Sequence, residues 1–318
     1  MEIRVQAGDI ATVAAKAIVV NLFEGVQQPG GATGAVDRAL GGAISQLIQE
    51  GEIKGKEGEV TVIHTLGRLP APRVLVAGLG KQEEFNLQKV RDVTANVLRQ
   101  ARRLGAETVA TVVHGAGAGG LEPEAAGQAI AEGAVMGLYR FRRYKNGGDD
   151  EKELRELTLV EFDASRTEAL QRGVERGRIL GEAANHTRDL ANEPANMLTP
   201  SELAERARSL AADAGLECEV WGREEIERMG MGALLGVAAG STQPPRFIIL
   251  RYRGRPDSQR TIGLLGKGIT FDSGGISLKP AQGMEEMKGD MSGGAAVIAA
   301  IWALAKLRAP INVVTMVP

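Results

Sequence analysis

Short runs of β-branched and other apolar residues alternate with longer segments of helical periodicity along the first half of the chain. Continuous apolar runs between turn residues are typical of buried strands, whereas apolar positions three and four residues apart indicate helices. The predicted strands cover residues 2–8, 17–23, 59–67, 73–80, 108–115 and 157–163, and the predicted helices cover 33–50, 86–105 and 122–143. This alternation predicts α/β layers around a largely buried sheet, and the polar, glycine-rich interval 145–152 predicts a surface loop.

The second half of the chain begins with a long helical pattern and then returns to strands. Apolar positions at helical spacing over 166–191 predict one rigid connecting helix. Thr199, Pro200 and Glu202 form a capping-box pattern with proline at the first helical position, and Gly215 ends the helix that they start. The strands predicted after it cover 217–222, 246–252, 261–266 and 311–317, with a helix over 292–307. We therefore predict an amino-terminal α/β domain over 1–164, a connecting helix over 165–191 and a second domain over 192–318.

Composition and charge narrow the classes of protein. With 43% hydrophobic and 25% charged residues, 318 residues suffice for two domains with separate cores. The formal net charge of -2 provides no global field to attract nucleic acid or anionic lipid, so the basic clusters 140–145 and 251–255 are interpreted as solvated ends of helices or strands. Charges interrupt the first twenty residues, and no apolar run of about 18 residues occurs, which predicts a cytoplasmic protein without a membrane span.

The cysteine and histidine counts limit the metal sites that this chain can build. Cys218 is the only cysteine, and the chain has three histidines and no HExxH motif. These counts exclude an internal disulfide and a thiolate metal cluster, and they disfavour a histidine-rich zinc site. Any metal bound here needs mainly carboxylate ligands. His64 and His114 lie in strand-like runs, so we interpret them as ordinary core or edge histidines.

The stretch GKGITFDSGGISLKP (266–280) admits three interpretations: a phosphate-binding loop, a metal site, or a glycine-rich turn that lets the backbone approach another element. The phosphate loop is disfavoured by spacing. Only two residues separate Gly263 from the Gly266–Lys267 pair, whereas a phosphate loop has four, and Gly268 stands where Ser or Thr is needed.

Charged residues in this region favour the metal site over the simple turn. Lys267 directly follows the apolar strand predicted over 261–266, and Asp272 follows the short β-type run ITF. Asp290 precedes a small-residue helix start and can point to the same crevice, because ligands of α/β sheets bind at the carboxyl ends of strands. A lysine and carboxylates desolvated there must pair, lose their charge or bind a cation. A lysine amine ligates a metal only when it is deprotonated, whereas a protonated Lys279 can act as an electrophile beside the metal.

At these residues the sequence resembles a known family. GKGITFDSGGISLKPAQGMEEMKGDMSGGAAV is similar to the metal-binding core of the leucyl aminopeptidase family, and HTRDLANEPANMLTP and MGALLGVAAGS extend the similarity. The resemblance implies a smaller amino-terminal, macro-domain-like α/β domain and a larger catalytic α/β domain with a central mixed sheet, which makes 192–318 part of the catalytic domain. It also implies an enzyme that hydrolyses the amino-terminal residue of peptide substrates and that assembles as a homo-hexamer when full-length.

The resemblance further implies roles for five residues. Asp272 would bridge two divalent metal ions per subunit, Zn or Mn, and Lys267 and Asp290 would complete one of them. Lys279 would stabilise the oxyanion as a metal-activated water attacks the peptide carbonyl. Met287 would help to line the pocket for the first side chain of the substrate. Such a pocket suits leucine-like side chains with broad specificity, because discrimination of one methylene is worth only about 1–3 kcal/mol.

Part of the family's pattern does not occur in this sequence. The family also uses an Asn-Thr-Asp-Ala-Glu-Gly-Arg stretch that supplies two more carboxylate ligands and an arginine. We therefore expect that the 318 residues are truncated at the carboxyl end and have little or no activity alone. The alternative function is a non-enzymatic binding or assembly protein that retains the fold, including a DNA-binding accessory role, which the net charge disfavours.

The amino-terminal half contains a second glycine-rich motif. GGATGAVDRALGG (30–42) follows a predicted strand, in an order similar to that of macro domains that bind ADP-ribose at helix amino termini. Fold alone does not transfer function. We interpret the motif as structural or as part of an assembly surface, with ADP-ribose binding as the alternative.

Overall fold

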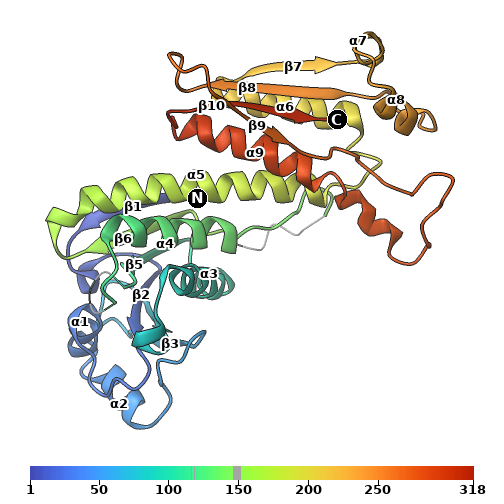
Figure 1. Cartoon of the computed structure of the whole chain (residues 1–318). Helices are drawn as coiled ribbons and strands as arrows, with labels where there is room; N and C mark the ends of the chain where they lie inside the picture. Colours follow the sequence, from blue (N-terminus) through green and yellow to red (C-terminus); the bar gives the residue numbers. More distant parts are fainter. Residues whose placement is uncertain (116, 118, 146–151) are drawn as a thin grey trace. The chain divides into compact units, whose positions relative to one another are not determined.

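The structure is a computed structural model that describes residues 1–115, 117, 119–145 and 152–318. The chain divides into two compact units, Met1–Gly181 and Glu182–Pro318, and each consists of one sheet with helices packed on it (Figure 1). The predicted α/β class is confirmed, and within this chain the second unit is the shorter one. Most of the loop predicted over 145–152 lies outside the described residues. No helix in the described ranges combines the length and the apolar character that crossing a bilayer requires.

A six-stranded sheet forms the centre of the first unit. Its strands are β1 (Glu2–Ala7), β2 (Ala17–Leu22), β3 (Val60–His64), β4 (Arg73–Gly78), β5 (Thr108–Val112) and β6 (Glu156–Glu161). They lie in the order β1-β6-β5-β2-β4-β3, and all neighbours are parallel except β3, which runs antiparallel to β4 at one edge. The strands predicted for this half of the chain are confirmed. Their apolar runs are continuous because a parallel sheet is buried on both faces, and the first four residues of β2 are all buried.

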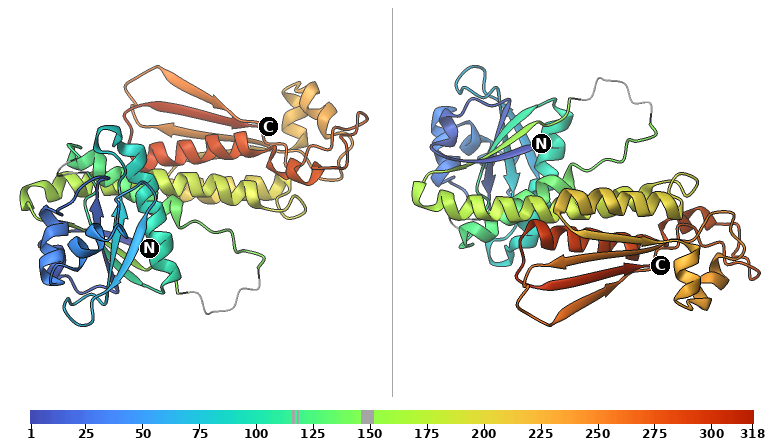
Figure 2. Two further views of the ribbon diagram at one scale, coloured as in Figure 1. Left: turned by 90° about the horizontal axis from the view of Figure 1, so that it is seen from below. Right: turned by 90° about the horizontal axis from the view of Figure 1, so that it is seen from above.

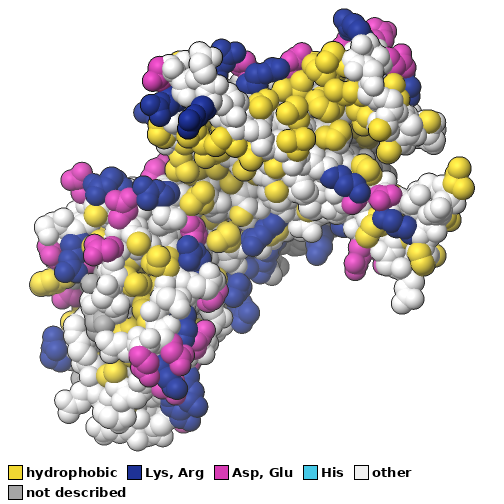
Figure 3. Space-filling view, viewed as in Figure 1, with side chains coloured by type: hydrophobic (Ala, Val, Ile, Leu, Met, Phe, Trp, Pro, Cys, Tyr) yellow, Lys and Arg dark blue, Asp and Glu magenta, His cyan; other side chains and the backbone are white. Residues whose placement is uncertain are grey.

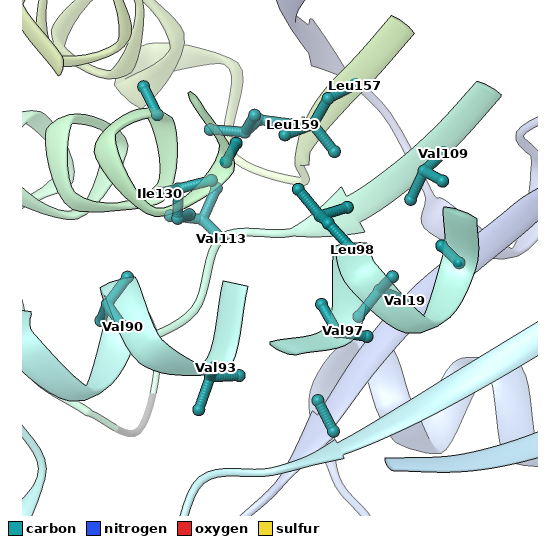
Figure 4. Close-up of a cluster of buried hydrophobic side chains, with 14 of the residues drawn as sticks. Val19, Val90, Val93, Val97, Leu98, Val109, Val113, Ile130, Leu157 and Leu159 are labelled. Atoms are coloured by element: carbon teal, nitrogen blue, oxygen red, sulfur yellow. The ribbon is translucent and has the colours of Figure 1, made fainter. Parts of the chain in front are cut away.

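Helices cover both faces of this sheet. The helices of the first unit are α1 (Gly31–Ala39), α2 (Ala43–Gln49), α3 (Leu87–Arg103), α4 (Pro123–Gly137) and most of α5 (Thr167–Asn192), with short 3-10 helices at Ile10–Thr12, Gln82–Glu84 and Ala164–Arg166. Val19 and Leu75 pack with α3, α4 and α5 in one core, part of which Figure 4 shows. Ile18 and Val74, one residue earlier on the same strands, pack with α1 and α2 on the other face. The sequence predicts one helix over 33–50, but two form.

Two glycines cause that break, and a buried histidine lies two residues after β5. Gly41 and Gly42 have φ of 70° and 86°, a left-handed conformation that an α-helix cannot contain. His114 is fully buried and lies 3.0 Å through Nδ1 from the amide of Asn21, and burial lowers its pKa to about 4. His64 lies at the exposed end of the edge strand β3. Both histidines are therefore the core and edge residues that the sequence predicts.

Glycines bring helices α4 and α5 into close contact. A Cβ atom added to Gly173 would lie 2.0 Å from the carbonyl oxygen of Glu124, and one added to Gly177 would lie 2.2 Å from that of Gln128. Leu170 and Val174 on the same helix are buried in the core. The close packing of α5 on α4 is thus possible only because glycine has no side chain at these two positions.

The second unit contains a four-stranded mixed sheet. Its elements are α6 (Pro200–Ala214), β7 (Glu217–Trp221), α7 (Arg223–Arg228), α8 (Gly232–Ala238), β8 (Phe247–Arg253), β9 (Thr261–Leu265), the 3-10 helix η4 (Met284–Gly289), α9 (Ser292–Lys306) and β10 (Asn312–Val317). The strand order is β7-β8-β10-β9, with β10 antiparallel to β8 and parallel to β9. Helices α6 and α9 lie on the same side of the sheet and bury Leu203, Leu250 and Ile298 against it (Figure 2). The sequence patterns did not predict the short helices α7 and α8.

The predicted start and end of α6 are confirmed. Thr199 accepts a hydrogen bond from the backbone nitrogen of Glu202 at 3.3 Å, Pro200 is the first helical residue, and Gly215 ends the helix with φ of 67°. The carboxylate of Glu202 accepts a hydrogen bond from Arg206 Nε at 2.7 Å. One half of the predicted capping box therefore forms.

The other face and one edge of this sheet are apolar and exposed. The strand register places Trp221, Phe247 and Met316 on the face opposite to the helices, and Figure 3 shows hydrophobic side chains gathered over the sheet. The side chain of Leu265 in β9 is 73% exposed. The prediction of a buried strand over 261–266 is therefore wrong for this chain, because among the described residues β9 pairs with β10 on one side only.

The close contact between α4 and α5 predicts that adding one methyl group at Gly173 lowers the stability of the first unit. Gly173→Ala should destabilise the first unit by about 1–3 kcal/mol, because the new Cβ overlaps the Glu124 carbonyl oxygen and forces the helices apart. In an open helical position the same change stabilises a protein by about 0.5–1 kcal/mol. Urea unfolding followed by circular dichroism measures the difference. Gln171→Ala, on the exposed side of α5, is the control and should change stability by less than about 0.5 kcal/mol. A Gly173→Ala variant as stable as the original chain would contradict the close contact.

Candidate metal centre

Glycines place the segment after β9 against the start of helix α9. A Cβ atom added to Gly266 would lie 2.4 Å from the carbonyl oxygen of Gly293, and the backbone nitrogen of Gly294 donates a hydrogen bond to the carbonyl oxygen of Lys267 at 2.8 Å. Residue 266 must be glycine for the chain to come this close to α9, since any side chain there would overlap the helix backbone. The glycine-rich turn that the sequence suggests as one interpretation therefore exists, and it fixes the position of Lys267.

The four charged residues predicted for the site form one cluster. Lys267 Nζ lies 2.8 Å from Asp290 Oδ2 and 3.7 Å from Asp272 Oδ2. Lys279 Nζ donates a hydrogen bond to the same Asp272 oxygen at 3.0 Å. One oxygen of Asp272 is thus shared by two amines, while Asp290 faces Lys267. Met287 also joins the cluster, because its sulfur lies 3.1 Å from Lys279 Nζ.

Turns after Asp272 hold this carboxylate in place. The other oxygen of Asp272, Oδ1, accepts a hydrogen bond from the backbone nitrogen of Gly274 at 2.9 Å. Gly274 and Gly275 have φ of 94° and 76°, so the chain reverses here in a conformation that favours glycine. The backbone nitrogen of Lys279 then bonds to the carbonyl oxygen of Ser273 at 2.9 Å, which closes the loop and returns the amine to Asp272. The run ITF before Asp272 has no regular structure, although the sequence suggested a β-type run.

The electrostatics of the cluster follow from these contacts. The hydrogen bond from Lys279, and then that from Gly274, lower the pKa of the Asp272 carboxyl. The neighbouring Asp290 carboxylate raises the pKa of the Lys267 amine. Both shifts favour the charged forms of the two groups, the Asp272 carboxylate and the Lys267 ammonium. The side chain of Lys267 is 50% exposed, and those of Asp272 and Asp290 are 29% and 20% exposed. The desolvation that the sequence analysis assumed for these side chains is only partial, because the cluster adjoins the exposed edge strand β9.

The cluster fits part of a ligand shell for a divalent cation. Asp290 Oδ2 is buried and takes part in no hydrogen bond, and its close neighbour is the ion-paired amine of Lys267. Buried polar atoms normally have hydrogen-bond partners, so this oxygen is available to a cation. Two carboxylates and one amine are the donors present, and the described ranges contain no group of three or more His, Cys, Asp or Glu that could hold a metal ion.

Lys288 is a residue of this region that the sequence patterns did not single out. It lies in η4 between Met287 and Asp290, and its Nζ donates a hydrogen bond to the backbone oxygen of Asn192 at 3.0 Å. This bond ties η4 to the end of α5 and so supports the position of Asp290. The only sequence feature that could have indicated this role is the position of Lys288 within the stretch MEEMKGD. A hydrogen bond to a carbonyl 96 residues away produces no local sequence pattern.

Comparisons with known proteins match both units of the chain. The family model "Cytosol aminopeptidase family, catalytic domain" matches residues 185–318, and the model of the N-terminal domain of the same family matches residues 19–147. A probable cytosol aminopeptidase of Alkaliphilus metalliredigens is 42% identical over 319 residues and one of Geobacter sulfurreducens is 40% identical over 318. Both alignments include the whole chain and 64% of the relative, so the chain spans less than two thirds of the length of these relatives.

Solved structures agree with the fold. The bottromycin maturation enzyme BotP in complex with Mn is 33% identical, with a TM-score of 0.79 over 96% of this chain and 59% of that one. A tomato leucine aminopeptidase mutant has a TM-score of 0.81 over 99% of this chain and 62% of that one, at 24% identity, and supports the fold alone. Since two domain models of one family and relatives at about 40% identity match along the chain, this chain belongs to the cytosol aminopeptidase family.

Proposed function

We propose that this chain contains the metal-binding core of a metal-dependent aminopeptidase, which removes the amino-terminal residue of peptides and prefers leucine-like residues. The observation that supports the proposal most directly is the convergence of Lys267, Asp272, Lys279 and Asp290 within ion-pair distance. The names of the relatives and the Mn complex of a 33% identical structure support it too. The proposal includes two divalent ions per subunit, Zn or Mn, a cytoplasmic location and a homo-hexamer of the full-length protein.

Asp272 and Asp290 are the proposed carboxylate ligands. Asp272 would bridge the two ions, and Lys267 and Asp290 would complete one of them. Bound divalent ions supply Lewis acidity to the peptide carbonyl and to water. The amines of Lys267 and Lys279 lie within ion-pair distance of these carboxylates, at positions where positive charge is stabilised. Asp272 is held by Gly274 through its other oxygen, so it would keep its orientation when its partner changes.

Lys279 is the proposed electrostatic catalyst. Its amine is held by a hydrogen bond to Asp272 and lies beside the sulfur of Met287. A fixed cation stabilises negative charge that develops on the carbonyl oxygen in the transition state, and it needs no reorganisation at that moment. Met287 is proposed to contact the first side chain of the peptide, since a flexible thioether adapts to apolar groups of different shapes.

Removal of the Lys279 amine tests the catalytic role. In the full-length protein, Lys279→Ala should lower kcat for a leucine anilide by about 10²–10³-fold, the usual loss for one group that stabilises an oxyanion. Initial rates over a range of substrate concentrations measure kcat and KM. Lys306→Ala removes an amine of α9 that binds Asp213 of α6 and serves as the control, with kcat expected to stay the same. Metal binding without hydrolysis in the unchanged protein would favour the non-enzymatic alternative.

Proton release tests the role of Lys267. The neighbouring Asp290 raises the pKa of Lys267, so this amine is protonated at neutral pH and must lose about one proton to ligate a metal. Affinity for Mn²⁺ should therefore rise about tenfold per pH unit between pH 6 and 8. Titration calorimetry in buffers of different ionisation enthalpy counts the protons released.

Two variants separate the ligands from their surroundings. Lys267→Met should abolish the release of this proton and flatten the pH dependence, and Asp290→Asn should weaken Mn²⁺ binding by at least about tenfold. Asp213→Asn, which removes a carboxylate partner of Trp302 and Lys306, should leave Mn²⁺ affinity unchanged. Mn²⁺ binding that is independent of pH in the unchanged chain would contradict a ligating amine.

A further inference from the structure

A basic cavity lies in the first unit, at the amino-terminal ends of the parallel strands β2, β4 and β5. Its volume is about 670 Å³, and Glu107 is the acidic side chain in its lining. The basic side chains that line it are Lys16, Arg73, Arg102, Arg103, Arg140 and Lys152. Lys16 precedes β2, Arg73 begins β4, and Arg102 and Arg103 are in the last turn of α3. Tertiary structure gathers these charges, because they are far apart in the sequence.

Arg102 is the buried member of the lining. It is 9% exposed, and its Nη1 donates a hydrogen bond to the backbone oxygen of Leu138 at 2.8 Å. Its Nε atom is buried and has no hydrogen-bond partner among the described residues. Burial, and then the positive charge of Arg140, lower the pKa of Arg102. A buried guanidinium without a carboxylate partner is unfavourable unless an anion compensates its charge.

Glu107, the acidic side chain in the described part of the lining, does not compensate Lys16, Arg73, Arg102 and Arg103. Glu107 lies 3.8 Å from Lys152 and 3.8 Å from Arg155, so its charge is already shared by two cations. Arg103 donates a hydrogen bond to the neutral amide of Gln100. Among the described residues of the lining, Lys16, Arg73, Arg102 and Arg103 thus lie around a cavity with one shared carboxylate, and the cavity volume is in the range of about 300–1,000 Å³ that is usual for small ligands.

We propose that this cavity binds a small anion that contains two or more linked phosphate groups. Arginine pairs with phosphate through two parallel hydrogen bonds, and several arginines at different positions of the wall suit several phosphates better than one. The basic groups line one cavity rather than an extended ridge, and the net charge of the chain is -2, which favours a compact ligand over a nucleic acid. Arg140, from the basic cluster that the sequence analysis interpreted as a solvated end, belongs to this site.

Titration calorimetry with inorganic triphosphate tests the proposal. The chain is first freed of divalent metal by dialysis against a chelator and then against plain buffer, so that metal-bound phosphate does not contribute. We expect one triphosphate per chain, at least about tenfold weaker binding of orthophosphate, and weaker binding as salt concentration rises. ATP is titrated in parallel. Equal affinities for ATP and triphosphate mean that the phosphate chain alone is recognised, whereas tighter binding of ATP assigns the site to a nucleotide.

Variants locate the binding. R73Q/R103Q removes two charges from the wall and should weaken triphosphate binding by at least about tenfold. The control R208Q removes an arginine of α6 that pairs with Glu205 outside the cavity, and should change the affinity by less than about twofold. R102Q should abolish binding, and its circular dichroism spectrum distinguishes loss of the site from loss of the fold. Absence of triphosphate binding, equal effects of R73Q/R103Q and R208Q, or tighter binding of duplex DNA than of triphosphate would overturn the proposal.

Discussion

Asp272 and Asp290 are stabilised by the two amines of Lys267 and Lys279, and this arrangement depends on how closely the glycine-rich segment after β9 approaches helix α9. At Gly266 a single Cβ atom would collide with the backbone of Gly293. The approach places Lys267 beside Asp290, which immediately precedes α9, and the reversal at Gly274 and Gly275 returns Lys279 to Asp272. Backbone geometry therefore positions the charged side chains, and the glycines are what allow that geometry.

Glycines also allow close backbone packing in the first unit. Gly173 and Gly177 allow α5 to lie on the backbone of α4, while Leu170 and Val174 of the same helix enter the core. Helix α5 continues from there into the second unit, where η4 is attached to its last residue through Lys288. Small residues thus set how closely the first part of this long helix packs on α4.

Charge has different functions in the two units. In the second unit, two amines and two carboxylates lie within a few ångströms of one another, so their charges balance locally. In the described part of the first unit, Lys16, Arg73, Arg102 and Arg103 line one cavity with one shared carboxylate, and the anion proposed above would compensate their charge. The net charge of the whole chain indicates neither, because the contributions cancel along the sequence.

The sequence by itself determined the α/β class, the strands of both sheets, the ends of α6 and the identity of the charged residues at the candidate metal centre. These follow from local patterns: buried apolar runs, a capping threonine, a terminal glycine and the motif around Asp272. Only the tertiary structure decided that β9 is an exposed edge, that 33–50 forms two helices, that Lys288 holds η4, and that Arg73, Arg102 and Arg140 meet in one cavity. The physical reason is that burial and the convergence of distant side chains depend on which strands become neighbours, and strand order is not encoded in any single segment.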